Sequence, residues 1–168
     1  TSIISPRHWQ RLQDMLADAQ AQGAQLHVHH PAGDVFDPAA RKMAPVIITG
    51  VRPSMRIAQE EVFGPVLSII KFKDEDDAVR IANDIRFGLA AAAWTKDIGR
   101  AIRMSEKLKA GTIWINTYRA ISYMAPFGGY KDSGLGRENG QDAIKEFLQV
   151  KSVWINSGAV SGNPFVMR

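Results

Sequence analysis

A short acidic and aromatic segment is the first place where this chain could do chemistry. Glu60, Glu61 and Phe63 lie in the run QEEVFGPV, where a Gly-Pro pair then turns the chain. A carboxylate has two acceptor oxygens, so it can hold two neighbouring hydroxyl groups of a ribose at once. In an extended segment, a ring two residues later lies on the same side and can press on a flat heterocycle such as nicotinamide. The other interpretation is a loop with a buried Phe63 and acids on the surface.

A second segment, PFGGYKDSGLGRENG, is rich in glycine. Its five glycines stand at positions 128, 129, 134, 136 and 140. Glycine lets backbone approach backbone or ligand closely, and it tolerates positive φ. The spacing fits neither G-x-G-x-x-G nor G-x-x-x-x-G-K-S/T, the two common phosphate-binding loops, and no strand immediately precedes the last three glycines. We therefore expect a packed loop that shapes a cavity.

The elements around these segments alternate between helices and strands. Three helices begin at residues suited to N-caps, Ser5, Asp74 and Asp97, and a further helix is expected near Glu138–Phe147. The stretch His30–Ala40 is typical of a loop. Strands are predicted at residues 24–29, 44–49, 66–72, 89–95, 112–116 and 150–155. Such alternation predicts an α/β fold with a mainly parallel sheet flanked by helices. We expect one unit over residues 1–155 and a tail at 156–168.

Composition excludes several classes of function. The 168 residues include no cysteine, so disulfides and cysteine metal sites are excluded. The net charge is 21 − 17 = +4, but the cations are scattered among acids, so we expect no nucleic-acid partner. No apolar run is long enough to span a membrane and no signal peptide is evident, which favours a cytoplasmic protein. The sequence does not begin with Met, so we expect it to start inside a longer chain.

The two segments, in this order, resemble the C-terminal portion of the aldehyde dehydrogenase superfamily. The stretches GLAAAAWTKD and KAGTIWINTY between them resemble the same region, and the similarity runs with few gaps from about Met55 to Ile155. The part before about Ala58 is a looser match. The resemblance implies the α/β catalytic domain of that family, truncated at its N-terminal side. It also implies NAD- or NADP-dependent oxidation of an aldehyde to a carboxylic acid.

The resemblance assigns roles to individual residues. The E-x-F-G-P motif implies that Glu61 binds the nicotinamide ribose hydroxyls and that Phe63 contacts the nicotinamide side. The loop after the W-I-N strand and the Phe of P-F-G-G imply an aldehyde pocket formed by Asn116, Thr117, Arg119, Ile121 and Phe127. From its residue type, Arg119 could pair with a substrate carboxylate. The alternative is that Arg119 points to solvent or to a partner subunit.

Lys131 and Glu138 are implied to lie near a proton relay of the family. A glutamate paired with a lysine in a dry site has a perturbed pKa that suits such a relay. The alternative is an ordinary ion pair at a helix N-terminus.

The family chemistry needs a cysteine thiolate that attacks the aldehyde carbon, and this chain has none. In the family, the cysteine, the water-activating glutamate, the oxyanion asparagine and the adenosine-binding half all precede this region. The resemblance therefore implies a fragment that is inactive alone. The alternative is a non-catalytic assembly or regulatory module with the same fold. A basic binding protein is a third interpretation.

Two further patterns carry weaker expectations. In the family the terminal segment packs at a subunit interface, and an exposed strand Phe147–Ile155 would otherwise invite pairing with another chain, so we expect a homo-oligomer. His27, His29 and His30 form H-x-H-H, in which alternate strand residues share a face. No third ligand is evident nearby, so we expect exposed strand residues and no metal site.

Overall fold

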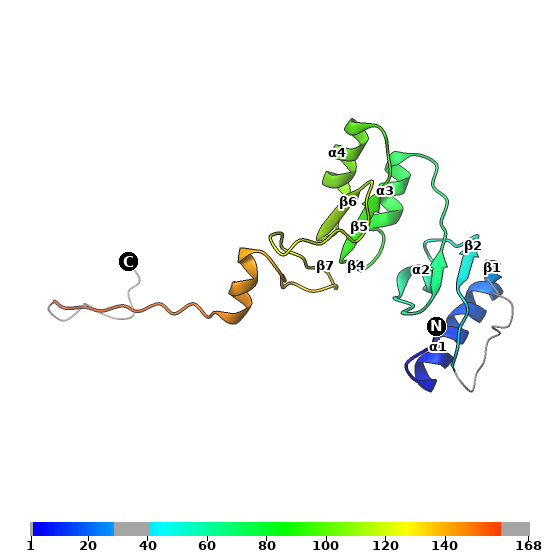
Figure 1. Cartoon of the computed structure of the whole chain (residues 1–168), viewed down its shortest axis with the longest axis horizontal. Helices are drawn as coiled ribbons and strands as arrows, with labels where there is room; N and C mark the ends of the chain where they lie inside the picture. The colour runs from blue at the N-terminus through cyan, green and yellow to red at the C-terminus, as the bar shows by residue number, and fades with distance from the viewer. Residues whose placement is uncertain (1, 29–40, 159–168) are drawn as a thin grey trace, which may run out of the picture.

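The computed structural model describes residues 2–28 and 41–158. Figure 1 shows an N-terminal lobe, a second lobe that follows it in sequence, and a C-terminal arm that extends away from both. The predicted loop His30–Ala40 and residues 159–168 of the predicted tail lie outside the described residues.

Helix α1 (Pro6–Ala21) begins and ends as its sequence predicts. The Ser5 hydroxyl accepts a hydrogen bond from the backbone N–H of His8 at 3.2 Å, and proline occupies the first turn. Gly23, at φ 92°, lets the chain reverse after the helix. The buried face of α1 consists of Leu12, Met15, Leu16 and Ala19.

That face packs on a three-stranded sheet with the order β1-β2-β3. The strand β1 (Gln25–Val28) pairs antiparallel with β2 (Val46–Thr49), and β2 pairs parallel with β3 (Val66–Ser68). A short helix, α2 (Arg56–Gln59), precedes β3 and buries Ile57. Most of the buried apolar residues belong to this lobe, so it holds the main core of the described chain.

In the second lobe, two helices accompany two small sheets. Asp74 and Asp97 cap α3 (Glu75–Asn83) and α4 (Ile98–Lys107) through side-chain oxygens that accept backbone N–H groups. A parallel pair joins two strands, β5 (Ala90–Ala93) and β6 (Thr112–Ile115). An antiparallel pair joins two further strands, β4 (Phe87–Gly88) and β7 (Tyr130–Lys131).

The predicted α/β class is confirmed, and the structure adds which strands pair with each other. Two of the strand pairs are parallel and two are antiparallel, and they belong to three separate sheets within the described residues. The strand predicted at 66–72 is paired only over Val66–Ser68, because β2 ends at Thr49 and offers little backbone beyond it.

The glycine-rich segment is closely packed, as predicted, and the structure shows that it packs against Gly111 just before β6. A Cβ on Gly111 would lie 1.7 Å from the carbonyl oxygen of Gly128, and a Cβ on Gly128 would lie 2.2 Å from that of Gly136. Only glycine permits backbones to approach so closely. Gly128 before β7 thus packs against Gly111, and Gly136 after β7 packs against Gly128.

The C-terminal predictions need correction. The expected helix at Glu138–Phe147 is a shorter 3-10 helix, η1 (Gln141–Phe147). The backbone N–H and C=O of Glu138 both bond to Phe127 at 2.7 Å, so Glu138 cannot join a helix. Residues 148–158 form no paired strand, because no described backbone lies alongside them. They form the exposed arm of Figure 1.

In the part of the chain that the structure describes, no helix combines the length and the apolar character needed to cross a membrane.

Replacing Gly111 by Ala should destabilise the second lobe. The new Cβ would collide with the Gly128 carbonyl, and forcing backbone apart costs about 1–3 kcal/mol or more. Thermal unfolding of the purified protein should show a lower Tm. Gly158→Ala is the matched control, since its Cβ would make only ordinary contact at 3.5 Å with the Asn156 side chain. An unchanged Tm for Gly111→Ala would contradict the close packing.

Candidate functional site

The two neighbouring carboxylates of the QEEVFGPV segment have different surroundings. Glu60 forms ion pairs with Arg56 at 3.0 Å and with Arg11 at 3.1 Å. The hydrogen bond from Arg56, reinforced by Arg11, lowers the pKa of the Glu60 carboxyl. The Glu61 carboxylate has no hydrogen bond or ion pair to any described residue and is exposed. Glu61 is therefore the carboxylate that remains available to a ligand.

Glu61 lines a cleft of about 550 Å³ between the two lobes. Most of the cleft wall comes from the second lobe, including Phe87 in β4, Leu89 after it and Lys109 before β6. The cleft thus combines one unpaired carboxylate with a largely apolar wall, a common composition of sites that bind small organic molecules.

Phe63 belongs to the same segment, but it is exposed and lies neither in the core nor among the residues that line the clefts described in this section. Its side chain is 69% exposed, which excludes the interpretation of a buried loop residue. Its backbone has φ 56°, a left-handed conformation that is rare for an aromatic residue. Such strain persists only where surrounding contacts hold it, and it is often found at ligand sites.

A second cleft, of about 320 Å³, lies beside the glycine-rich segment. Phe127 and Glu138 both line it, joined by their two backbone hydrogen bonds. Leu89 and Ser133 line this cleft as well as the cleft of Glu61. The predicted residues Glu61 and Phe127 therefore lie in two clefts that share a wall.

Lys131 and Glu138 do not form the expected ion pair. The Lys131 ammonium donates hydrogen bonds to the carbonyl oxygens of Asn83 at 3.0 Å and Ile85 at 2.8 Å, at the end of α3. A cation at this position stabilises the carbonyl groups that a helix end leaves unpaired. Lys131 thus has a structural role here, while the relay role of Glu138 stays a prediction.

The loop after β6 lines none of the three clefts described in this section. The Asn116 side chain bonds both backbone groups of Thr95 at 2.8 Å, so it fastens the ends of β5 and β6 together. Thr117, Arg119 and Ile121 are exposed and line none of the clefts described here. Their assignment to an aldehyde pocket stays a prediction.

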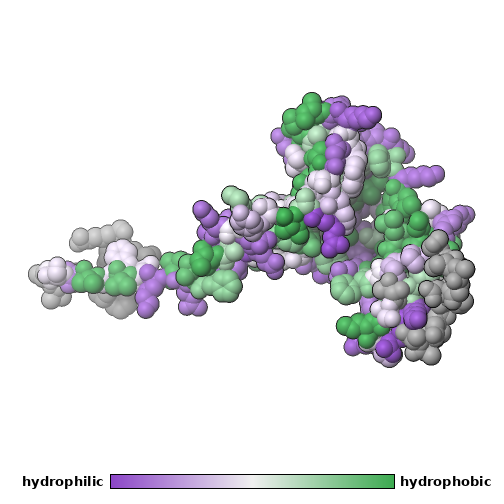
Figure 2. All heavy atoms as spheres, viewed as in Figure 1, coloured by the Kyte–Doolittle hydropathy of each residue, from purple (hydrophilic) through white to green (hydrophobic). Residues whose placement is uncertain are grey.

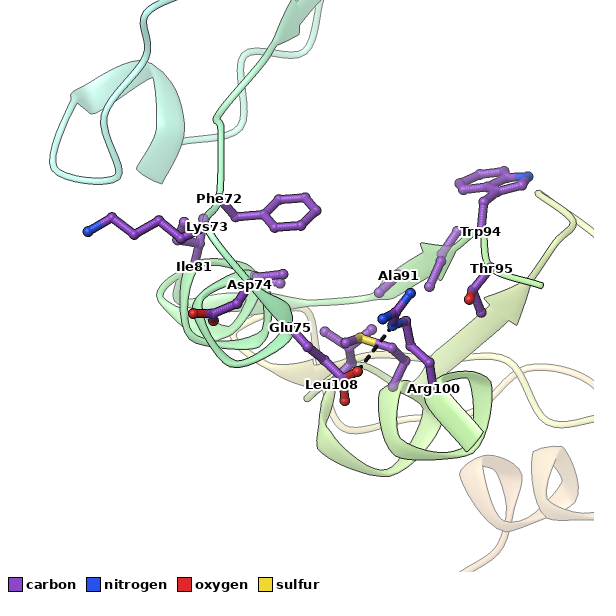
Figure 3. Close-up of a pocket in the computed structure, with 15 residues that line it drawn as sticks. Phe72, Lys73, Asp74, Glu75, Ile81, Ala91, Trp94, Thr95, Arg100 and Leu108 are labelled. Atoms are coloured by element: carbon purple, nitrogen blue, oxygen red, sulfur yellow. Dashed lines mark hydrogen bonds and ion pairs between the residues drawn. The ribbon is translucent and has the colours of Figure 1, made fainter. Parts of the chain in front are cut away.

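The largest of these clefts, about 650 Å³, holds a different kind of carboxylate (Figure 3). Glu75 accepts hydrogen bonds from Arg103 at 2.6 and 2.8 Å and from Arg100 at 3.1 Å. The Arg103 bonds, with help from Arg100, lower the pKa of Glu75 to about 2. A carboxyl that stays ionised at neutral pH cannot serve as a general acid at that pH. Because Glu75 lies on α3 and both arginines lie on α4, these ion pairs join the two helices.

Sequence reasoning missed the side chains that hold the Glu61 segment. Arg11 and His8 on α1 bond its backbone, and Gln59 links it to the carbonyl oxygens of Pro53 and Asp84. Arg11 and His8 lie about fifty positions away in sequence, so no local pattern could associate them with the segment.

The structure describes only one of the three histidines of the H-x-H-H pattern. His27 places its ring Nε2 2.9 Å from the Thr49 hydroxyl, while His29 and His30 lie outside the described residues. Over residues 2–28 and 41–158, no cluster of three His, Cys, Asp or Glu side chains is arranged to hold a metal ion.

Known proteins share both this sequence and this fold. A sequence profile of the aldehyde dehydrogenase family matches residues 1–153. An aldehyde dehydrogenase of Emericella nidulans is 44% identical over 155 residues, 92% of this chain and 31% of the relative. The chain belongs to the aldehyde dehydrogenase family. A 2-aminomuconic semialdehyde dehydrogenase of Danio rerio is 39% identical over 158 residues, 92% of this chain and 32% of that family member.

A solved structure of the family extends the match to three dimensions. The betaine aldehyde dehydrogenase of Staphylococcus aureus, in complex with NAD+, superimposes with a TM-score of 0.83 at 40% identity. The match covers 99% of this chain and 33% of that protein. This chain therefore spans about a third of the length of the aldehyde dehydrogenases that it matches.

The Glu75 ion pair predicts a specific acid dependence. The pKa of the Glu75 carboxyl is about 2 in the folded chain against 4.5 ordinarily. The ion pair therefore stabilises the fold fully above pH 4.5, and this stabilisation is lost as the pH falls towards 2. Glu75→Gln should lower the Tm at neutral pH and flatten its decline across this acid range. Asp76→Asn is the control, because that side chain is 86% exposed in its pair with Lys107. Equal acid profiles for Glu75→Gln and the parent would contradict this assignment.

Proposed function

We propose that this chain forms the C-terminal part of an aldehyde dehydrogenase that oxidises an aldehyde to a carboxylic acid with NAD or NADP. The observation that carries the proposal is the unpaired Glu61 carboxylate, which lines a largely apolar cleft and stands two residues before the exposed Phe63. The membership of the family and the NAD+ complex of a structural neighbour support it.

The residues present fit one side of a nicotinamide cofactor. The two oxygens of Glu61 can accept hydrogen bonds from the two hydroxyls of a ribose, and no described side chain competes for them. The Phe63 ring offers an apolar surface to a flat heterocycle. The cofactor, when bound, supplies the hydride acceptor. Glu61 and Phe63 would bind and orient it.

The nucleophile is proposed to come from residues outside this chain. The chain contains no cysteine, and it spans about a third of its relatives. We therefore expect no dehydrogenase activity from these 168 residues alone. A non-catalytic module with the same fold remains the alternative, and it would bind no nicotinamide cofactor.

The substrate side of the site is proposed to include Phe127 and the exposed loop after β6. Arg119 has φ 58° and no hydrogen bond or ion pair to a described residue. Its guanidinium is therefore available to pair with the carboxylate of an acidic aldehyde. One relative is a semialdehyde dehydrogenase, which agrees with this substrate class, whereas the structural neighbour is a betaine aldehyde dehydrogenase.

Glu61→Gln in the natural gene product that contains these residues should weaken NAD binding at least about tenfold. The change removes the negative charge from an acceptor of two hydrogen bonds, and hydrogen bonds to charged groups are the stronger ones. Isothermal titration with NAD and with NADP measures the effect. Glu106→Gln makes the same change in charge at an exposed carboxylate without a described partner, and should bind as the parent does. Unchanged affinity in Glu61→Gln would rule out the proposed role.

The terminal arm is proposed to form a homo-oligomer interface, as its apolar exposure suggests. Figure 2 shows hydrophobic residues along the arm, and Val150, Val153, Trp154 and Ile155 are each at least 69% exposed. A monomer rarely leaves such a run in water, and extended backbone without a partner is ready to pair with another chain.

Placing charges on the arm should dissociate this assembly. The double variant Val150→Asp and Trp154→Asp in the natural gene product should show a lower mass by sedimentation, because buried unpaired carboxylates are costly. Gln149→Asp adds a charge at an already polar, exposed position and should leave the mass unchanged. If the double variant kept the parent's mass, the arm would not be the interface.

A further inference from the structure

We propose that Arg11 and His8 are positioning residues, which fix the backbone of residues 60–63 so that the Glu61 carboxylate and the Phe63 ring face the cofactor. This inference rests on the proposed function above, since it assumes that the segment binds a nicotinamide cofactor. Neither residue belongs to the E-x-F-G-P motif, and both act through backbone atoms.

Arg11 holds the acidic half of the segment. One terminal nitrogen donates to the carbonyl oxygens of Glu61 at 2.9 Å and Val62 at 3.4 Å. The other nitrogen bonds the Glu60 carboxylate at 3.1 Å. A guanidinium is a rigid planar fork, so these three acceptors are fixed relative to one another. Glu60 is thus turned onto α1 and α2, which leaves Glu61 free to face the cleft.

His8 holds the aromatic half. Its Nε2 lies 2.8 Å from the carbonyl oxygen of Phe63, and a carbonyl can only accept, so Nε2 must carry the hydrogen. The two rings also meet edge to face, with centroids 6.0 Å apart. One side chain therefore restrains both the backbone and the ring of Phe63.

The conformation of Phe63 needs such restraint. A left-handed φ of 56° is unfavourable for an aromatic residue, so an unrestrained segment would relax towards extended backbone and redirect the ring. His8 and Arg11 are three residues apart and lie on one face of α1, so they reach the segment together. Gly64 completes the contact, because its Cβ position lies about 3 Å from the buried Leu12 side chain.

Two measurements on the natural gene product test this role. Native-state cleavage by a glutamate-specific protease reports local opening of the Glu61–Val62 bond without any cofactor. Steady-state kinetics separate KM for NAD from kcat. Arg11→Leu and His8→Leu should each speed cleavage at this bond about tenfold and raise KM for NAD about tenfold, with kcat and Tm close to those of the parent. His8→Gln, whose amide can still donate to the carbonyl, should restore both values.

Arg7→Leu is the matched control, because Arg7 lies on the same helix, is exposed, and has no partner among the described residues. Unchanged cleavage in Arg11→Leu and His8→Leu would overturn the restraint itself. Faster cleavage with an unchanged KM would overturn its role in cofactor binding. A large fall in Tm with cleavage throughout the chain would show a general structural role and overturn the proposal. If the parent bound no NAD, the proposed function would fail, while the protease result would still report on the contacts.

Discussion

Burial of one face of α1 is the interaction on which the site depends. Leu12, Met15 and Leu16 are almost fully buried against the β1-β2-β3 sheet, and each buried side chain of this kind contributes about 2 kcal/mol. Because this packing fixes the rotation of the helix about its axis, it also fixes where the flanking polar residues point. Arg11 and His8 face the segment 60–63 for that reason. Hydrophobic packing of one helix face thus sets the geometry of the polar residues beside it.

Tertiary contacts also decide which glutamates form ion pairs within the fold and which stay available to a ligand. Glu60 and Glu75 each accept bonds from two arginines, and both have lowered pKa values. Glu61 has no such partner in the described chain. Adjacent residues of identical chemistry therefore differ because tertiary contacts engage one and leave the other exposed. The proposed ligand-binding group is the one that the fold does not use.

The apolar surface is distributed unevenly. The N-terminal lobe has a continuous core, whereas α3 has no fully buried residue and the arm is exposed along its length. Exposed apolar area of this extent is typical of surfaces that contact other polypeptide. This agrees with a chain that spans a third of its relatives and with the proposed homo-oligomer.

The sequence by itself determined the helices at Ser5, Asp74 and Asp97, the α/β class, the tightly packed glycine segment and the family, because caps, periodicity and motifs are local signals. Only the tertiary structure decided that Lys131 binds carbonyls at the end of α3 instead of Glu138, and that residues 148–158 lack a strand partner. It alone brought α1 to the Glu61 segment. Such contacts join residues far apart in the chain, and their geometry depends on how whole elements pack, which no local pattern records.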